Sequence, residues 1–274
     1  VTRSACKSGR DCLGFELKHA LWAAPLLPAA LVAGNAKAPP KATDTPTVVD
    51  SQTMRAIDAP GNVGDWMSYS RGWSEQRYSP LAQIDDANVG QLGLAWYDDL
   101  ETFRGVQASP LVIDGVLYGT SPDLALFALD AATGRERWRF TPDAGAGGVP
   151  AGLNRGLTWW SEGRERRLMF SAGHYLYAID PAEGKAIDSF GDHGHIDLLD
   201  GLDRDTKGLY LAANTPGAIF RDLIIMPMRL GEGPGPAAPG HIRAYDVRTG
   251  KRRWIFHTIP QPGEKGVETW SPNS

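Results

Sequence analysis

Ala128–Trp138 (ALDAATGRERW) is the stretch that decides the fold, because it recurs along the chain. It returns at Ala244–Trp254 (AYDVRTGKRRW), and a degraded copy, Ala178–Lys185 (AIDPAEGK), lies between the two. In every copy an Asp begins a turn and a Gly accepts a positive φ, and in the complete copies a Trp reappears on the next strand. Copies roughly 50–65 residues apart are too distant for one hairpin and leave room for the other strands of a four-stranded blade. The repeat therefore predicts a β-propeller.

The composition supports an all-β fold and limits the function. The chain has 274 residues with 32 Gly, 20 Pro and 9 Trp, which favours many turns and aromatic-rich strands over a helical bundle. The formal net charge is −4 and no Lys/Arg cluster stands out, so nucleic acid is not expected as a partner. Because the only cysteines are Cys6 and Cys12, neither a disulfide nor a cysteine metal site is expected in the folded part.

The first forty residues have the layout of a secretory signal. Scattered basic residues precede an apolar run, Ala20–Gly34 (ALWAAPLLPAALVAG), and small residues that offer cleavage sites follow it. The run is short for a membrane span and contains two prolines, so a disordered leader or an N-terminal anchor with possible membrane association is the alternative. We expect residues 1–40 to be a signal-like leader that exports the protein to the periplasm or cell envelope. Residues 41–60 are expected to be a linker.

Residues 61–274 are expected to form the blades. Turn signals at Asp114-Gly115, Glu162-Gly163 and Arg221-Asp222 each separate two β-rich runs, and a further strand leads into each copy of the repeated phrase. About three four-stranded antiparallel units with little helix are therefore predicted. Before them, residues 81–96 are expected to form a short helical turn, capped by Asp85 or Asp86, that feeds a strand at 94–97.

An ordered series of phrases resembles the pyrroloquinoline quinone (PQQ)-dependent dehydrogenases, especially the branch similar to membrane-associated quinoprotein glucose dehydrogenases. The resemblance runs from about residue 60 to the end. The series is more specific than the Trp-bearing repeat alone. Its phrases are Asp65-Trp66, Arg77–Leu81 (RYSPL), Ser109–Val112 (SPLV), Asn154–Leu157 (NRGL), Phe190–Asp192 (FGD), Thr215–Gly217 (TPG) and Gly240–Asp246 (GHIRAYD).

The resemblance implies an eight-bladed propeller with PQQ and a divalent cation in its axial channel. This chain would supply about the first half of that ring. The PQQ-stacking Trp and the general-base Asp of the family would lie beyond Ser274. No catalytic residue is therefore assigned in this chain, and residues 1–274 alone are expected to be inactive.

Arg155 and Gln107 are the first two residues that the resemblance assigns to the cofactor. PQQ is a planar quinone with three carboxylates, so its site needs cations, hydrogen-bond donors and an aromatic platform. Arg155 matches the family arginine that pairs with the cofactor, and its planar guanidinium suits a carboxylate or quinone oxygen. Gln107 falls where many relatives have Glu or Gln facing PQQ, and its amide can donate and accept. A surface turn arginine and an ordinary polar residue at a strand start are the alternatives.

Three further residues are candidates for cofactor binding on the same grounds. Ser171 matches a family Thr or Ser whose hydroxyl could bind a PQQ carboxylate. Asn214 and Thr215 belong to a loop that the family also directs at the cofactor. A common blade-edge serine and residues that cap a turn are the alternatives.

Metal ligands are signalled more weakly. Some relatives place an acidic calcium ligand near the long Gly/Pro loop, here residues 231–240, and Glu232 is the nearest candidate for binding Ca²⁺ or another divalent or trivalent cation. The alternative is a flexible loop. His193 and His195 are close enough to be a pair of metal ligands, but no third ligand is signalled, so solvated loop histidines are expected.

Two classes of function follow. In the intact enzyme of the family, PQQ would accept a hydride equivalent from an alcohol or sugar hydroxyl, and electrons would pass to a cytochrome or quinone. Alcohol-oxidising relatives carry adjacent cysteines before the Asn-Arg-Gly phrase, whereas Ala151–Leu153 stand there in this chain, which favours the sugar-oxidising or uncharacterised branch. The alternative is a cofactor-free propeller scaffold of the bacterial envelope, which uses a similar repeat. The Arg77–Leu81 and Asn154–Gly156 phrases favour the enzyme, since fold alone does not decide function.

Overall fold

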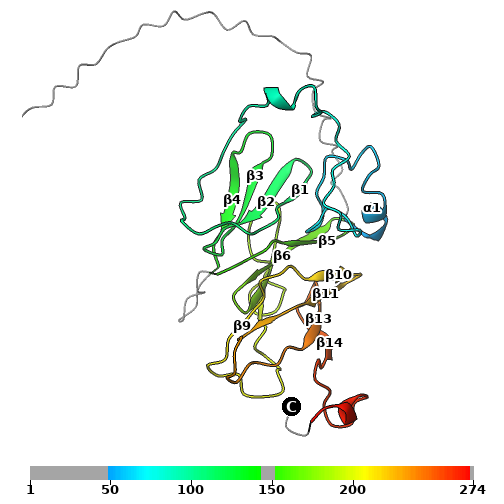
Figure 1. Cartoon of the computed structure of the whole chain (residues 1–274), viewed down its shortest axis with the longest axis vertical. Coiled ribbons are helices and arrows are strands. Elements are labelled where there is room, and N and C mark those ends of the chain that lie inside the picture. The colour runs from blue at the N-terminus through cyan, green and yellow to red at the C-terminus, as the bar shows by residue number, and fades with distance from the viewer. Residues whose placement is uncertain (1–48, 143–151, 272–274) are drawn as a thin grey trace, which may run out of the picture. The chain divides into compact units, whose positions relative to one another are not determined.

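The computed structural model describes residues 49–142 and 152–271. In this part of the chain, three four-stranded antiparallel sheets follow one another in sequence (Figure 1). The prediction of antiparallel four-stranded blades is therefore confirmed. The expected leader, residues 1–40, lies outside the described residues.

Each sheet is a meander whose neighbouring strands pair in chain order. The first sheet contains β1 (Leu111–Ile113), β2 (Val116–Thr120), β3 (Leu126–Asp130) and β4 (Glu136–Phe140). The second contains β5 (Thr158–Glu162), β6 (Glu165–Ala172), β7 (Tyr175–Ile179) and β8 (His195–Asp197). The third contains β10 (Ala218–Phe220), β11 (Leu223–Met226), β13 (Ile242–Asp246) and β14 (Arg252–Phe256). A separate two-stranded ladder pairs β9 (Leu211–Ala212) with β12 (Arg229–Leu230).

The helices of the described residues are short. They are α1 (Ser51–Arg55) and the 3-10 turns η1 (Val89–Gln91) and η3 (Val267–Thr269). None of these described helices has the length and apolar character needed to cross a membrane. α1 falls within residues 41–60, the segment expected to be a linker, and Val49, Met54 and Ile57 beside or within it are buried in the core.

The segment before the first sheet confirms one local prediction and contradicts another. The carboxylate of Asp85 accepts hydrogen bonds from the amides of Ala87 and Asn88, so the predicted turn at Asp85 is present. The strand predicted at 94–97 is wrong, because these residues form no ladder with any described strand. Trp96 instead lies against Gly134 of the first sheet, so the apolar run is used for docking rather than for pairing.

The repeated phrase folds as predicted, and its Asp organises the turn. The carboxylate of Asp130 accepts hydrogen bonds from the amide and the hydroxyl of Thr133, while its carbonyl accepts one from the Gly134 amide at 2.8 Å. Asp246 makes the same contacts to Thr249 and Gly250. The three turn glycines have φ of 69–71°, which is the left-handed region that favours glycine.

A tryptophan from the preceding unit docks on two of these turns. Trp96 covers Gly134 and Trp138 covers Gly184, and a Cβ added to Gly134 would lie only 2.6 Å from the indole ring of Trp96. The indole N–H of Trp96 donates to the carbonyl of Ala131 at 3.2 Å, and that of Trp138 donates to the carbonyl of Pro181 at 3.1 Å. Each acceptor directly follows the turn Asp, so the two contacts are equivalent in successive sheets.

The third junction departs from this pattern. Gly250 faces the side chain of Ile196 from β8 instead of an indole. Ile196 therefore takes the place that Trp96 and Trp138 occupy in the first two turns. The tryptophan of the last copy, Trp254 on β14, is 39% exposed.

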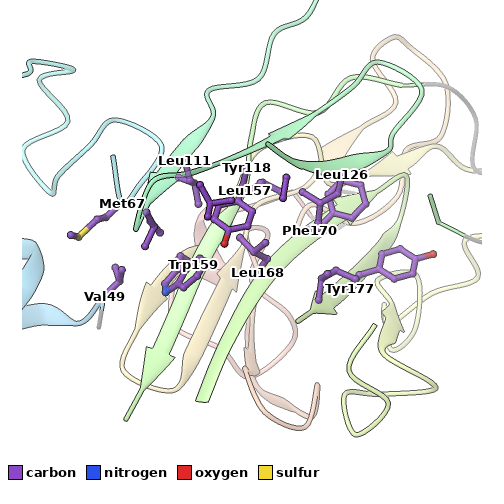
Figure 2. Close-up of a cluster of buried hydrophobic side chains, with 14 of the residues drawn as sticks. Val49, Met67, Leu111, Tyr118, Leu126, Leu157, Trp159, Leu168, Phe170 and Tyr177 are labelled. Atoms are coloured by element: carbon purple, nitrogen blue, oxygen red, sulfur yellow. The ribbon is translucent and has the colours of Figure 1, made fainter. Parts of the chain in front are cut away.

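The middle sheet separates two hydrophobic clusters. Along β6, Leu168 and Phe170 face the cluster shared with the first sheet, whereas Met169 between them faces the cluster shared with the third. Trp159 and Trp160 on β5 divide in the same way. This alternation follows from the two-residue period of a strand. Figure 2 shows the first cluster, where Trp159, Leu168, Phe170 and Tyr177 meet Leu111, Tyr118 and Leu126 from the first sheet.

Asp65 is expected to make stability depend on pH. Burial, together with the nearby charge of Asp114, raises the pKa of its carboxyl to about 6. Since the folded chain then keeps a proton that the unfolded chain releases near pH 4, stability falls as pH rises from about 4 to about 6. We expect Asp65→Asn to stabilise the chain at pH 7.5 by about 1 kcal/mol, after discounting a full effect of about 3 kcal/mol for solvent screening.

Urea unfolding at pH 4.5 and pH 7.5 measures this effect. The gain from Asp65→Asn should be clearly smaller at pH 4.5, where the folded carboxyl is protonated. Asp86→Asn is the matched control, since Asp86 is exposed. An equal gain at both pH values would refute the assignment.

Candidate functional site

The segments that lead into the first strands of the three sheets are joined by backbone hydrogen bonds. The Ser109 amide donates to the carbonyl of Arg155, and the Arg155 amide donates to the carbonyl of Asn214, each at 2.9 Å. The Thr158 hydroxyl on β5 also donates to the carbonyl of Gly217, directly before β10, at 2.6 Å. One predicted site residue from the second sheet and one from the third thus lie side by side, and Gln107 is two residues from Ser109.

Asn154 holds this junction together from within the protein. Its side-chain carbonyl accepts hydrogen bonds from the Thr120 hydroxyl at 3.0 Å and from the Gly156 amide at 2.8 Å. Its amide nitrogen donates to the carbonyl of Ser171 at 2.7 Å. Because Asn154 is 5% exposed, these three bonds fix the backbone on either side of Arg155 in a dry environment.

Gly156 lets three segments approach one another closely. Its φ is 145°, and a Cβ at this position would lie 2.9 Å from the carbonyl oxygen of Ser109 and 3.4 Å from Pro216 and Tyr69. Gly156 also forms a parallel bridge with Ser109. The phrase Asn-Arg-Gly therefore combines a buried amide, a protruding arginine and a position without room for a side chain.

The cofactor-binding candidates differ in how accessible they are. Arg155 and Gln107 are exposed, Thr215 is half-buried and Asn214 is 8% exposed. Within residues 49–142 and 152–271, the Arg155 guanidinium has no hydrogen-bond or ion-pair partner. The positively charged guanidinium of Arg155 is therefore exposed where the three sheets meet, and it is available to bind an anionic group.

Ser171 is placed differently from the exposed candidates. It is 4% exposed, and its hydroxyl donates to the carbonyl of Ala213 at 2.7 Å. This hydrogen bond links the second sheet to the residue before Asn214. Ser171 is therefore close to the junction, but its hydroxyl proton already has an acceptor; its role toward a cofactor stays a prediction.

Glu232 does not lie beside the cofactor-binding candidates at the junction. It follows β12, whose pairing with β9 carries it past Tyr210 and away from Asn214. Its carboxylate forms an exposed ion pair with Arg229 at 3.2 Å. Its role as a cation ligand stays a prediction as well.

His193 and His195, both expected to be solvated loop histidines, are placed differently. His193 is exposed and contacts the carboxylates of Asp188 and Asp192. His195 lies on β8, where its ring stacks on Tyr177 with centroids 5.3 Å apart.

A cavity of about 790 Å³ lies beside the junction. It is bounded by the segment around α1, by β5 and by the residues that lead into β10, and Thr215 lines it. Its walls combine apolar side chains such as Met67, Leu157 and Trp159 with hydroxyl groups. Such a lining suits a small organic molecule with a few polar groups.

Three successive four-stranded meanders, joined through the segments that lead into their first strands, have the arrangement of β-propeller blades. A family model described as "PQQ: Glucose/ethanol/alcohol dehydrogenase, beta-propeller domain" matches residues 66–274. The chain belongs to this family of PQQ-dependent dehydrogenases. The predicted resemblance and the propeller fold are therefore confirmed, while the assignment to the glucose dehydrogenase branch stays a prediction.

The matches with known relatives cover only part of each relative's length. The quinohemoprotein alcohol dehydrogenase ADH-IIG of Pseudomonas putida is 36% identical over 261 residues, which is 89% of this chain and 33% of the relative. The crystal structure of the quinohemoprotein alcohol dehydrogenase of Comamonas testosteroni has a TM-score of 0.63 at 30% identity, covering 79% of this chain and 30% of that one. A europium-containing methanol dehydrogenase, with a TM-score of 0.55 at 24% identity and coverage of 75% and 34%, shows the fold alone. The chain spans about a third of the length of these relatives.

Sequence reasoning missed the structural role of two neighbours of Arg155. Asn154 and Gly156 were part of the family phrase, but no local pattern shows that Asn154 contacts Thr120 and Ser171. An Asn two residues before a Gly does indicate a turn in which the Asn side chain binds a following amide. That signal was sufficient to predict the bond to Gly156, although not the other two.

Proposed function

We propose that this chain supplies one side of the PQQ-binding channel of a quinoprotein dehydrogenase that oxidises an alcohol hydroxyl. The observation that carries the proposal is the guanidinium of Arg155, which has no hydrogen-bond or ion-pair partner among the described residues and is exposed where the segments leading into three first strands meet. The family membership and the alcohol dehydrogenase activity named for the relatives support it. A sugar hydroxyl is the second candidate substrate, on the resemblance to the glucose dehydrogenase branch.

The residues at the junction fit the chemistry of the cofactor. Arg155 offers a planar cation to a carboxylate or quinone oxygen, and the side chains of Gln107 and Asn214 offer amide donors. Thr215 adds a hydroxyl from the wall of the cavity. When bound, PQQ supplies the two-electron acceptor for the oxidation. The part of this chain is to bind and orient the anionic edge of PQQ.

The remaining parts of the activity are assigned to the complete ring. The general base and the group that stacks on PQQ are proposed to come from other blades of the ring. Calcium or another divalent or trivalent cation is proposed to bind beside PQQ, with Glu232 as the candidate ligand from this chain. Electrons are proposed to pass to a cytochrome or a quinone; one relative is named 1-butanol dehydrogenase (cytochrome c). The proposed location is the periplasm or cell envelope.

Replacing Arg155 by alanine is expected to weaken PQQ binding by about 10- to 150-fold, which corresponds to about 1.5–3 kcal/mol for a charge-assisted hydrogen bond. The fold should be unchanged, because the side chain is exposed and has no partner among the described residues. The measurement is a PQQ titration of a ring in which residues 66–271 replace the matching blades of P. putida ADH-IIG. Arg135→Ala, in an exposed turn, is the control.

Unchanged PQQ affinity in the Arg155→Ala ring would overturn the assignment of this site. A separate assay addresses the chain by itself, which we propose to be inactive because it spans about a third of its relatives. Residues 1–274 with PQQ and calcium should show no dye-linked oxidation of alcohols or sugars. Measurable turnover would show that the later blades are dispensable.

A further inference from the structure

Asp203, His241 and His257 place one metal-ligating atom each within 4.8 Å of one another. Asp203 lies in the loop between β8 and β9, His241 directly precedes β13, and His257 directly follows β14. The cluster therefore brings the loop between β8 and β9 to one end of the β13–β14 pair. None of these residues belongs to the group around Arg155.

The distances within the cluster suit a small divalent ion. The Nε2 atoms of His257 and His241 lie 2.8 and 3.5 Å from the same carboxylate oxygen of Asp203. Ligands of a tetrahedral zinc ion with bonds of about 2.0–2.1 Å are about 3.3 Å apart. The two distances to Asp203 lie on either side of this value, and all three ligand atoms lie within 4.8 Å of one another.

His257 is already oriented in the way that metal-binding histidines are. Its Nδ1 atom lies 2.7 Å from the Glu264 carboxylate, so that nitrogen faces a hydrogen-bond acceptor and Nε2 points at Asp203. A carboxylate behind a ligating histidine fixes the ring and increases its basicity. Glu264 therefore has the position of a supporting residue behind a metal ligand.

His241 is buried and has one ring nitrogen directed at the cluster. Its side chain is 5% exposed, and Nε2 is the ring nitrogen that faces Asp203. The buried Nδ1 atom has no hydrogen-bond partner among the described residues, but it is not the nitrogen that faces Asp203. The Nε2 contact to Asp203, at 3.5 Å, is too long to be a strong hydrogen bond. A buried imidazole in this situation requires explanation, because buried polar groups are normally satisfied.

We propose that Asp203, His241 and His257 bind a zinc ion, with water in the fourth position. Two imidazoles and one carboxylate suit zinc, whereas calcium requires six to eight oxygen ligands. Asp203 is about half exposed, which leaves an open side for the ion and its water. The ion would link the loop that carries Asp203 to the start of β13 and the end of β14. Glu264 would be attached to the site through its contact with His257. This inference does not depend on the proposed dehydrogenase function.

Zinc titration of the purified chain, in the presence of excess calcium, tests the proposal. We expect one equivalent to bind and the midpoint of thermal unfolding to rise. Asp203→Asn and His257→Gln should each weaken zinc binding more than about 100-fold, because loss of a supporting residue alone costs about 10- to 100-fold. Glu264→Gln should fall in that smaller range. Co²⁺ in place of zinc should give the visible absorption of a tetrahedral site.

His193→Gln is the matched control, since His193 also contacts two carboxylates but is 83% exposed. It should leave zinc affinity and stoichiometry unchanged. Asp203→Asn changes an exposed loop residue and keeps the fold testable even if a histidine variant unfolds. The proposal is wrong if the chain binds no zinc, if Asp203→Asn binds it as tightly as the parent chain, or if His193→Gln removes the binding.

Discussion

Replacing Gly184 by alanine is expected to destabilise the chain by about 3–4 kcal/mol. The added Cβ would overlap the indole ring of Trp138, which rests on this glycine and donates a hydrogen bond to Pro181. Displacing a packed side chain costs about 1–3 kcal/mol, and the left-handed backbone at φ 69° adds about 1–2 kcal/mol for a residue with a Cβ. The measurement is urea unfolding followed by tryptophan fluorescence.

Gly163→Ala separates the two contributions. Gly163 has a φ of 58°, but nothing lies within 4 Å of a Cβ added there. Its replacement should therefore cost only the backbone term of about 1–2 kcal/mol. Equal losses in the two variants would mean that the indole contact contributes nothing.

Replacing Asn154 by alanine is expected to cost about 3 kcal/mol of stability. The change removes three buried hydrogen bonds and leaves the Gly156 amide and the Ser171 carbonyl without their partner. An unsatisfied buried group costs about 1–3 kcal/mol, and a small cavity adds to this. Equilibrium unfolding in urea measures the loss.

Thr120→Val provides the graded comparison for Asn154. It removes only the hydroxyl that donates to Asn154 and nearly preserves the volume of the side chain. We expect a loss of about 1 kcal/mol, because the Asn154 carbonyl keeps its bond to Gly156. If Asn154→Ala lies within 0.5 kcal/mol of the parent chain, a central role of the amide in the junction is excluded.

The parts of the fold that could be predicted are those that local chemistry determines. Asp130 and Gly134 act within one turn, and Asp114-Gly115 forms the two-residue hairpin that its sequence indicates. β8 was missed because residues 192–197 (DHGHID) show no strand pattern; this strand exists through its pairing with β7. The false strand at 94–97 has the opposite cause, since an apolar run that docks through Trp96 resembles one that pairs.

The candidate site could be predicted only in part, for a related reason. Arg155 was identified as a candidate because it matches the Asn-Arg-Gly phrase of the family, and the structure shows that its side chain is exposed. The bonds of Asn154 join residues 34 and 17 positions away, which no local spacing reports. The same holds for Asp203 and His257, which meet across 54 positions of sequence.

The tryptophan contacts between sheets also set an order for synthesis. The indole of Trp96 donates a hydrogen bond to a carbonyl 35 positions later in the chain, and the indole of Trp138 donates to one 43 positions later. At translation rates of about 5–20 residues per second, the residue that carries each carbonyl is synthesised only about 2–9 seconds after the tryptophan that binds it. Neighbouring blades can therefore lock together one after another on the ribosome, in the manner of nearest-neighbour repeat proteins, without contacts from distant parts of the chain.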